Sequence, residues 1–359
     1  MTYFNSTKRP NNSAFVRFSG GSRTLAVASD KAAKVYNLLG VNNVKLTYVN
    51  ASCTDAVCLE RLNTSNLLAI VRVSNPKQVD LLEITRGNKL CTLDFESAVL
   101  DVKLNSKIVV VCLEESIMIQ PMENLSKQHK ITDLWQNYNG VCALGKYLAY
   151  PSSSNGELHL YDIDEQTVKR KISVPDGPLV IIEFSSTGDY LATASEKGTL
   201  IWVYDTSSGE MLWQFRRGAM RCASVYSLSF SQDNKFLCCS SNTGTVHVFR
   251  LQPQPSGGDS ETNAEVGWLS WASSFLPSFF PEDRSFAMAR LLTQCDRTAC
   301  CIKSITMEDE TSGLKTVVYT MFVATDKGDL FIYEIDPAVG GECKLLSSIR
   351  WEKDIVESS

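Results

Sequence analysis

Two adjacent arginines past the middle of the chain are the residues best suited to bind a charged ligand. Arg216 and Arg217 stand in the run Phe-Arg-Arg-Gly, Arg221 follows shortly after, and no acidic residue occurs from Met211 through Gln232. A guanidinium is a planar fork of donors that matches a phosphate group bidentately. Neighbouring residues of an extended strand point to opposite faces, so the pair predicts two anion pockets, one on each side of a strand. The alternative, that these arginines pair with aspartates of neighbouring structural units, stays open at this point.

A charge-free segment, Val266–Phe280, is the second candidate for function. Apolar residues recur along it at helical spacing with serines gathered opposite, and Pro277 would kink or end such a helix. Exposed tryptophan and phenylalanine partition well into a membrane interface, and the alternative is a lid that folds back onto the protein. The side chains predicted to enter a membrane are Trp268, Leu269, Trp271, Phe275, Leu276, Phe279 and Phe280.

A repeat along the chain must position both candidates: the arginines lie at the end of one copy, and the charge-free segment lies in a long connection that breaks the repeat. The repeat consists of an alternating strand, a small polar turn, an apolar strand ending in small residues, another turn and a third strand. Its copies are Phe184–Tyr204, Phe230–Phe249 at a distance of 46 residues, Phe18–Tyr36 and, in part, Met321–Tyr333. A period in the forties with glycine, aspartate or asparagine turns indicates four-stranded propeller blades.

Seven such blades fill the chain, which predicts an all-β fold, a seven-bladed β-propeller of four-stranded WD-type blades. The propeller is expected over 14–350, with a flexible N-terminus at 1–13, a long insertion in blade six at 252–284 and a C-terminal tail at 351–359. Candidate strands of the first blade are contiguous, so we expect the ring to close without the usual exchange of an end strand. The predicted blades cover approximately 15–50, 53–96, 98–131, 141–174, 178–218, 225–291 and 300–350.

Composition excludes several classes of function. The formal charge of −5, from 35 basic and 40 acidic side chains, argues against nucleic-acid binding by bulk attraction. Twelve cysteines form no Cys-x-x-Cys motif, and only three histidines are available, so we expect no metal, no cofactor and no acid–base catalysis. The polar N-terminus carries no signal-peptide core, and no apolar stretch reaches the ~20 residues of a membrane span. A reduced, cytoplasmic, non-enzymatic protein is expected.

With the Phe-Arg-Arg-Gly motif following a propeller blade, the chain resembles the PROPPIN family, the WIPI-type β-propellers that bind phosphoinositides. Leu191–Thr199, Arg284–Leu291 and Gly340–Cys343 add further matches, and the likeness runs from about Phe15 to Cys343. The resemblance implies binding of phosphatidylinositol 3-phosphate and phosphatidylinositol 3,5-bisphosphate at two sites. It also implies a membrane-recruited scaffold of autophagosome formation, with the blade-six insertion entering the bilayer.

Transferred position by position, the resemblance implies one site on each side of the motif. The equivalent serines and threonines of blades five and six are both separated by 46 residues. The phosphoinositide-binding residues would be Arg216, Ser195 and Thr199 in the first site, and Arg217, Ser241, Thr245 and His247 in the second, with Arg221 nearby. His247 would add charge only when it is protonated.

Two departures from the family pattern concern the first site. Pro175 stands where relatives often carry a histidine, and Trp202 stands where they often carry an arginine. Both changes are expected to weaken the first site relative to the second.

Partners and location follow from the resemblance alone. It implies recruitment to phagophore and endosomal membranes and contact with a lipid-transfer protein of the autophagy machinery. Glu123, where close relatives can carry arginine, disfavours contact with the coiled-coil adaptor of the lipid-conjugation system. The competing hypothesis is a propeller scaffold that acts only through protein–protein contacts, with the arginines structural.

Overall fold

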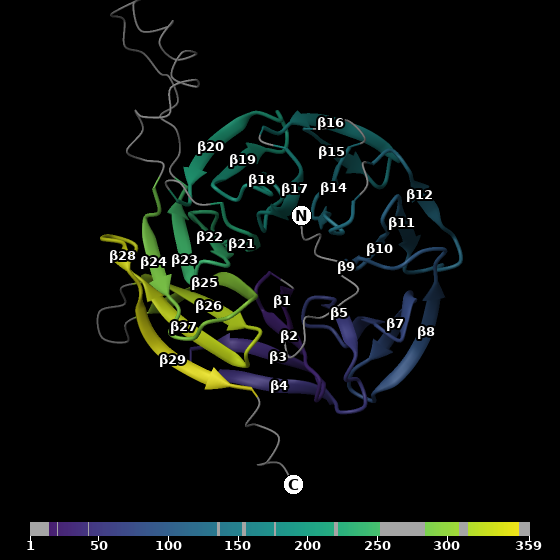
Figure 1. Ribbon diagram of the computed structural model, residues 1–359, viewed down its shortest axis with the longest axis horizontal. Helices are drawn as coiled ribbons and strands as arrows, with labels where there is room; N and C mark the ends of the chain where they lie inside the picture. The colour runs from purple at the N-terminus through teal and green to yellow at the C-terminus, as the bar shows by residue number, and fades with distance from the viewer. Residues whose placement is uncertain are drawn as a thin grey trace, which may run out of the picture.

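The chain forms a ring of seven antiparallel sheets around a central channel (Figure 1). The computed structural model describes residues 14–19, 21–41, 43–134, 137–152, 156–175, 177–218, 222–251, 284–308 and 315–351. The predicted seven-bladed β-propeller is confirmed. Six blades have four strands, and blade six has a fifth.

The strands follow one another around the ring, and each blade takes its strands in chain order from the channel outwards. Blades one to three comprise β1 (Phe15–Ser19), β2 (Thr24–Ala28), β3 (Ala33–Gly40), β4 (Asn43–Asn50), β5 (Ala56–Arg61), β6 (Leu67–Arg72), β7 (Asn75–Glu83), β8 (Asn88–Asp94), β9 (Asp101–Leu104), β10 (Ile108–Cys112), β11 (Ile117–Pro121) and β12 (His129–Ile131). Blades four and five comprise β13 (Ala143–Leu144), β14 (Leu148–Pro151), β15 (Glu157–Asp162), β16 (Thr167–Ser173), β17 (Leu179–Phe184), β18 (Tyr190–Ser195), β19 (Leu200–Asp205) and β20 (Met211–Arg216). Blades six and seven comprise β21 (Val225–Phe230), β22 (Phe236–Ser241), β23 (Thr245–Arg250), β24 (Ala287–Arg290), β25 (Thr298–Glu308), β26 (Lys315–Thr325), β27 (Asp329–Ile335), β28 (Gly341–Glu342) and β29 (Lys344–Arg350).

Hydrophobic cores lie between the blades, one at each of the seven junctions of the described ring. Strand alternation produces this arrangement, because successive residues of a middle strand face different neighbouring blades. In β19, for example, Trp202 packs towards blade four, whereas Ile201 and Val203 pack towards blade six. Each blade therefore buries both of its faces.

Within the described residues, the ring closes by packing between blades one and seven without an exchanged strand, as the contiguous first blade predicted. The amide of Ala14 donates to the carbonyl of Asp326 (3.1 Å), and the Lys34 ammonium donates to the carbonyl of Trp351. The predicted C-terminal tail begins at Trp351, yet this residue is buried in the core of the junction.

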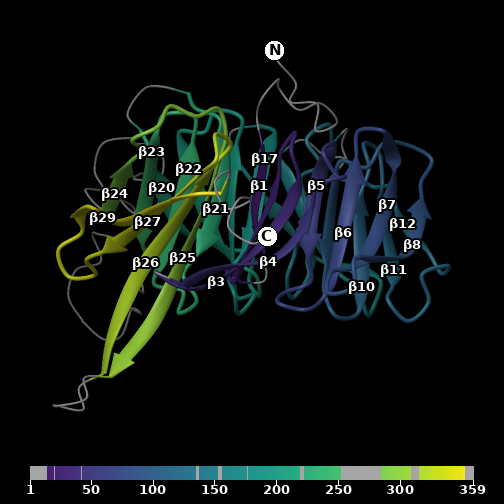
Figure 2. The same cartoon turned by 90° about the horizontal axis from the view of Figure 1, so that it is seen from below.

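Two features of blades six and seven depart from a regular repeat. The connection between β27 and β29 contributes the two-residue strand β28, which pairs in parallel with β24 as a fifth strand of blade six. The β25–β26 hairpin has strands of eleven residues and extends beyond the ring, as Figure 2 shows.

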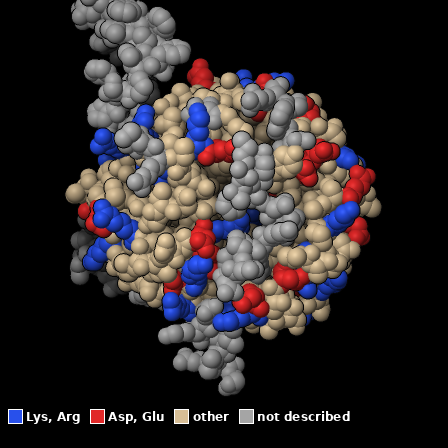
Figure 3. Space-filling model, in the orientation of Figure 1, with Lys and Arg blue, Asp and Glu red and all other residues tan. Residues whose placement is uncertain are grey.

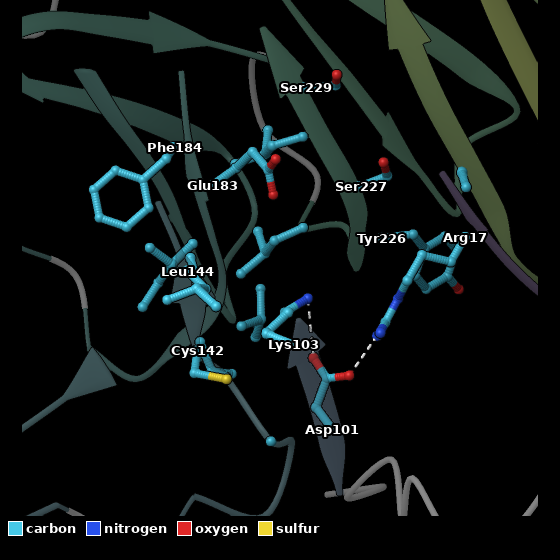
Figure 4. Close-up of a pocket in the computed structure, with 18 of the residues that line it drawn as sticks. Arg17, Asp101, Lys103, Cys142, Leu144, Glu183, Phe184, Tyr226, Ser227 and Ser229 are labelled. Carbon is cyan, nitrogen blue, oxygen red and sulfur yellow. Dashed lines mark ion pairs between the residues drawn. The ribbon is translucent and has the colours of Figure 1, made fainter. Parts of the chain in front are cut away.

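Charged side chains from several inner strands meet in the central channel, a cavity of about 1730 Å³. Arg17 lies 2.7 Å from Asp101 and 3.1 Å from Glu60, and Lys103 lies 3.1 Å from Asp101. Figure 4 shows Glu183 pointing into the same space from β17. Burial in the channel wall raises the pKa of Glu183 to about 7, although the charge of Lys103 opposes this effect.

This pKa makes the stability of the propeller depend on pH. The carboxyl binds its proton more tightly in the folded chain than in the unfolded one, where its pKa is about 4.3. The protonated Glu183 carboxyl therefore makes its full contribution to the free energy of unfolding below about pH 4, and this contribution is lost as the pH rises through 7. We expect Glu183→Gln to remove this decline and to stabilise the protein at pH 8 by on the order of 1 kcal/mol. Denaturant unfolding between pH 5 and 8 measures the effect, with exposed Glu210→Gln as control. Identical pH profiles for wild type and Glu183→Gln would contradict it.

Candidate functional site

The end of β20 places Arg216 and Arg217 on opposite sides of blade five. Arg216 pairs with Leu200 of β19, which packs against the core shared with blade four. The ring of Phe215, one residue earlier, stacks on Phe249 of blade six at 4.8 Å. Arg217 follows on the same side as Phe215, and its side chain reaches blade six. The two arginines thus face two junctions, as the alternation predicted.

The contacts of Arg217 between blades five and six include three uncharged oxygens, and we call this group of residues the second pocket. Its side chain is only 7% exposed, and its Nε donates to the carbonyl of Gly198 at 2.7 Å. Its Nη1 lies 3.4 Å from Ser241 Oγ and 3.2 Å from Thr243 Oγ1, and these two hydroxyls are 2.9 Å apart. Thr245, the other predicted hydroxyl of this site, is half-buried at the start of β23. Thr243 is not among the residues predicted from the sequence, although it stands in the same Ser-Asn-Thr-Gly-Thr run as the predicted Ser241 and Thr245.

Close backbone packing fixes the carbonyl that holds Arg217. Gly198 has a φ of +57°, and a Cβ there would lie 1.7 Å from the carbonyl oxygen of Ala223. The amide of Ala223 in turn donates to the carbonyl of Lys197 at 3.2 Å. Only glycine fits between the β18–β19 turn and the chain entering blade six. The acceptor for Arg217 is therefore part of a rigid contact.

His247 completes this pocket as a neutral imidazole. It lies on β23 opposite Cys239, and its ring is parallel to that of Phe249 at 6.3 Å. Burial, with a smaller effect from the charge of Arg217, lowers the pKa of His247 to about 4. Its Nδ1 is buried and has no hydrogen-bond partner. At neutral pH His247 thus offers a polar ring nitrogen and no charge.

The pocket on the blade-four side is built differently. Ser195 is 1% exposed, and its buried hydroxyl has no hydrogen-bond partner; Thr199 and Arg216 are half-buried. Trp202 pairs with Thr193, and 46 residues later Cys239 pairs with His247. Trp202 therefore occupies in blade five the place that His247 occupies in blade six.

This substitution changes the character of the first pocket. Trp202 is 1% exposed and belongs to the core between blades four and five. An apolar ring therefore stands where the second pocket has an unsatisfied ring nitrogen. Pro175, the other departure, is exposed in the connection that leads into blade five.

Comparison with known proteins places the chain in a family. A family model described as PROPPIN matches residues 13–350. The chain belongs to the PROPPIN family. It is 36% identical over 338 residues to WD repeat domain phosphoinositide-interacting protein 1 of Xenopus laevis, covering 90% of this chain and 75% of the relative. It is 31% identical over 372 residues to Autophagy-related protein 18 of Caenorhabditis elegans, covering 96% and 87%. The solved structure of Kluyveromyces lactis Hsv2 shares the fold, with a TM-score of 0.69 at 20% identity over 94% of this chain and 99% of that one.

PROPPINs are non-enzymatic, so the expectation that this chain is not an enzyme is confirmed by its family. Within the described residues no helix could span a membrane, and no group of His, Cys, Asp and Glu side chains could hold a metal ion. Arg221 lies outside the described residues. So do the predicted membrane-entering side chains Trp268, Leu269, Trp271, Phe275, Leu276, Phe279 and Phe280.

The lowered pKa of His247 provides a test of the second pocket that needs no ligand. NMR titration is expected to give a value of about 4 in this PROPPIN, which has only three histidines to assign. Arg217→Gln should raise the pKa towards the ordinary value of about 6.5, because it removes a positive charge that disfavours the imidazolium. Arg216→Gln, on the other face of the strand, should leave the value unchanged. A pKa that does not respond to Arg217→Gln would contradict the pocket described above.

Proposed function

We propose that this PROPPIN binds phosphatidylinositol 3-phosphate and phosphatidylinositol 3,5-bisphosphate at two pockets flanking Arg216 and Arg217, and acts as a membrane-recruited scaffold in autophagosome formation. The observation that carries the proposal is the setting of Arg217, a desolvated guanidinium held by a carbonyl and two hydroxyls. The relatives are named as phosphoinositide-interacting and autophagy-related proteins, which supports the lipid class and the process.

A phosphate suits the second pocket for electrostatic reasons. Burial lowers the pKa of Arg217, which means that the surroundings penalise its charge. A phosphate in the pocket would offset that penalty, since charge-assisted hydrogen bonds are stronger in a partly desolvated site. The hydroxyls of Ser241 and Thr243 can turn towards phosphate oxygens, and His247 can present a ring N–H. Binding would also raise the pKa of His247, because an anion favours its protonated form.

The first pocket is proposed to be the weaker one. Arg216 and Thr199 can still reach a phosphate, but Trp202 supplies neither charge nor an exposed donor there. The hydroxyl of Ser195 is buried and would have to be reached by the ligand. The proposal therefore includes a lower affinity for phosphate in the first pocket than in the second.

The proposed membrane contact runs along the side of the ring. Thr245 and Arg250 are the two ends of β23, so the second pocket and the start of the insertion are roughly 17 Å apart at ~3.3 Å per residue. Over the flat face in Figure 3, acidic and basic side chains are interspersed, and neither sign dominates. Head-group pockets and an apolar insertion on one side would act together as a multivalent contact.

Recruitment to phagophore and endosomal membranes, and contact with a lipid-transfer protein of autophagy, are further parts of the proposal. A solved relative, KlAtg21, shares this fold in a complex with the coiled coil of AgAtg16, with a TM-score of 0.68 at 19% identity. In the present chain Glu123 is exposed after β11. The proposal therefore does not include contact with such a coiled-coil adaptor, which an acidic side chain at this position disfavours.

Removing both guanidinium groups tests the lipid sites. The double variant Arg216→Gln/Arg217→Gln is expected to lose sedimentation with liposomes that contain phosphatidylinositol 3-phosphate. Of the single variants, Arg217→Gln should weaken calorimetric binding of the soluble head group about tenfold or more, because a charged hydrogen bond contributes about 1.5–3 kcal/mol. Arg216→Gln should weaken it less.

Exposed Arg86→Gln is the charge-matched control and should bind as the wild type does. If the double variant binds liposomes normally but unfolds at a lower temperature, the arginines are structural. That outcome would support the competing hypothesis of a scaffold that uses only protein contacts.

The insertion is tested separately from the pockets. Replacing Trp268, Trp271 and Phe275 by serine should weaken liposome binding several-fold, because burial of aromatic surface in the interface is lost. The affinity for the soluble head group should be unchanged in the same calorimetric assay. Loss of both activities would instead show that the insertion supports the propeller itself.

A further inference from the structure

The two ends of the blade-six insertion leave from adjacent strands. β23 ends at Arg250, and the described chain resumes at Arg284 shortly before β24. The amide of Phe286 donates to the carbonyl of Val248 at 2.8 Å, and the amide of Leu251 donates to the carbonyl of Lys235 at 2.8 Å. Both ends are therefore hydrogen-bonded to blade six.

Blade seven reaches across to the second of these ends. Within the β27–β29 connection, the amide of Gly341 donates to the carbonyl of Phe286 at 2.9 Å. The amide of Cys343 donates to the carbonyl of Met288 at 2.7 Å. Blade six already has four strands of its own, so the parallel strand β28 is an addition that the propeller repeat does not require.

One side chain joins both ends to blade seven. The guanidinium of Arg250 lies 3.8 Å from the centre of the Phe286 ring and donates to the carbonyl of Pro337. Phe286 also stacks on Phe236 of β22 at 5.7 Å. Stacking of arginine on an aromatic face is directional, which a lysine ammonium reproduces poorly. Arg250 thus links the residue before the insertion, a residue after it and the blade-seven connection.

Gly340 makes the tightest contact of this group. Its φ is +70°, and a Cβ would lie 2.3 Å from the carbonyl oxygen of Phe286 and 2.7 Å from its ring. Gly341 has a similar φ of +82°, yet a Cβ there would have nothing within 4 Å. The two neighbouring glycines share a backbone requirement, and only the first is also needed for close approach.

From these contacts we infer that the 336–343 connection of blade seven braces the ends of the insertion, and that Arg250, Phe286 and Gly340 are positioning residues for membrane binding. The inference rests on the proposed function, in which the insertion enters the bilayer. Fixed ends limit the directions in which the insertion can leave the ring. The effective concentration of a tethered second contact depends on such geometry, so the brace strengthens membrane binding without touching lipid.

A glycine with the same backbone requirement outside the brace provides the matched control. Gly340→Ala should weaken binding to phosphatidylinositol 3-phosphate liposomes by about three- to tenfold, and Gly87→Ala, at a φ of +67° with nothing within 4 Å of the added Cβ, should bind nearly as the wild type does. Both should keep the wild-type affinity for the soluble head group. The blue shift of tryptophan emission on adding liposomes should be smaller for Gly340→Ala, since Trp268 and Trp271 of the insertion would enter the interface less often. A merely structural role would not produce this selective change.

Variants of Arg250 separate bracing from direct attraction to lipid. Arg250→Lys keeps the charge and loses the planar stack, so bracing predicts that it weakens liposome binding as much as Arg250→Gln does. Full binding by Arg250→Lys would overturn the inference, as would wild-type liposome binding by Gly340→Ala. If Gly340→Ala does not fold, the two Arg250 variants decide the question. Failure of the wild-type chain itself to bind these liposomes would instead overturn the proposed function.

Discussion

Alternation along the strands is the constraint on which this structure depends. A propeller blade is covered on both faces, so successive residues of a middle strand belong to different junctions of the ring. The same rule packs Trp202 and Val203 into different cores, and it sends Arg216 and Arg217 into different pockets. A site between two blades is therefore formed by side chains of both blades. The second pocket takes its guanidinium from the end of blade five and its hydroxyls and imidazole from blade six.

The second pocket also shows how an acidic protein keeps a local positive site. Uncharged oxygens of Gly198, Ser241 and Thr243 contact Arg217, and these contacts do not neutralise its charge. His247 is kept neutral beside it, so the free pocket does not contain two adjacent cations. With a formal charge of −5 on the whole chain, bulk anionic lipid gains little from approaching. Under the proposed function, recognition depends instead on the fit of the head group.

Much of the fold could be predicted because the repeat is visible in the turns and in strand alternation. The number of blades and their approximate limits agree with the structure. So do closure of the ring without an exchanged strand and the placement of the two arginines on opposite sides of blade five. The equivalence of Trp202 and His247 is not visible in the sequence, because the β18–β19 turn (196–199) has one residue more than the β22–β23 turn (242–244), and the spacing of 46 fails there. β28 was also missed, since a two-residue strand from another blade's connection has no periodicity of its own. Thr243 is recognisable as a pocket residue only through its contacts with Arg217 and Ser241.

Closure without an exchanged strand has a consequence for biosynthesis. Every blade here takes four strands from one continuous stretch, so it can be completed as soon as that stretch has left the ribosome. No early strand has to wait, with an open edge, for a partner made hundreds of residues later. The packed core around Trp351, between blade seven and blade one, can form only after both blades have been made. The ring can thus be built in the order in which it is translated, and its seam is a packing contact between two sheets that exchange no strand in the described chain.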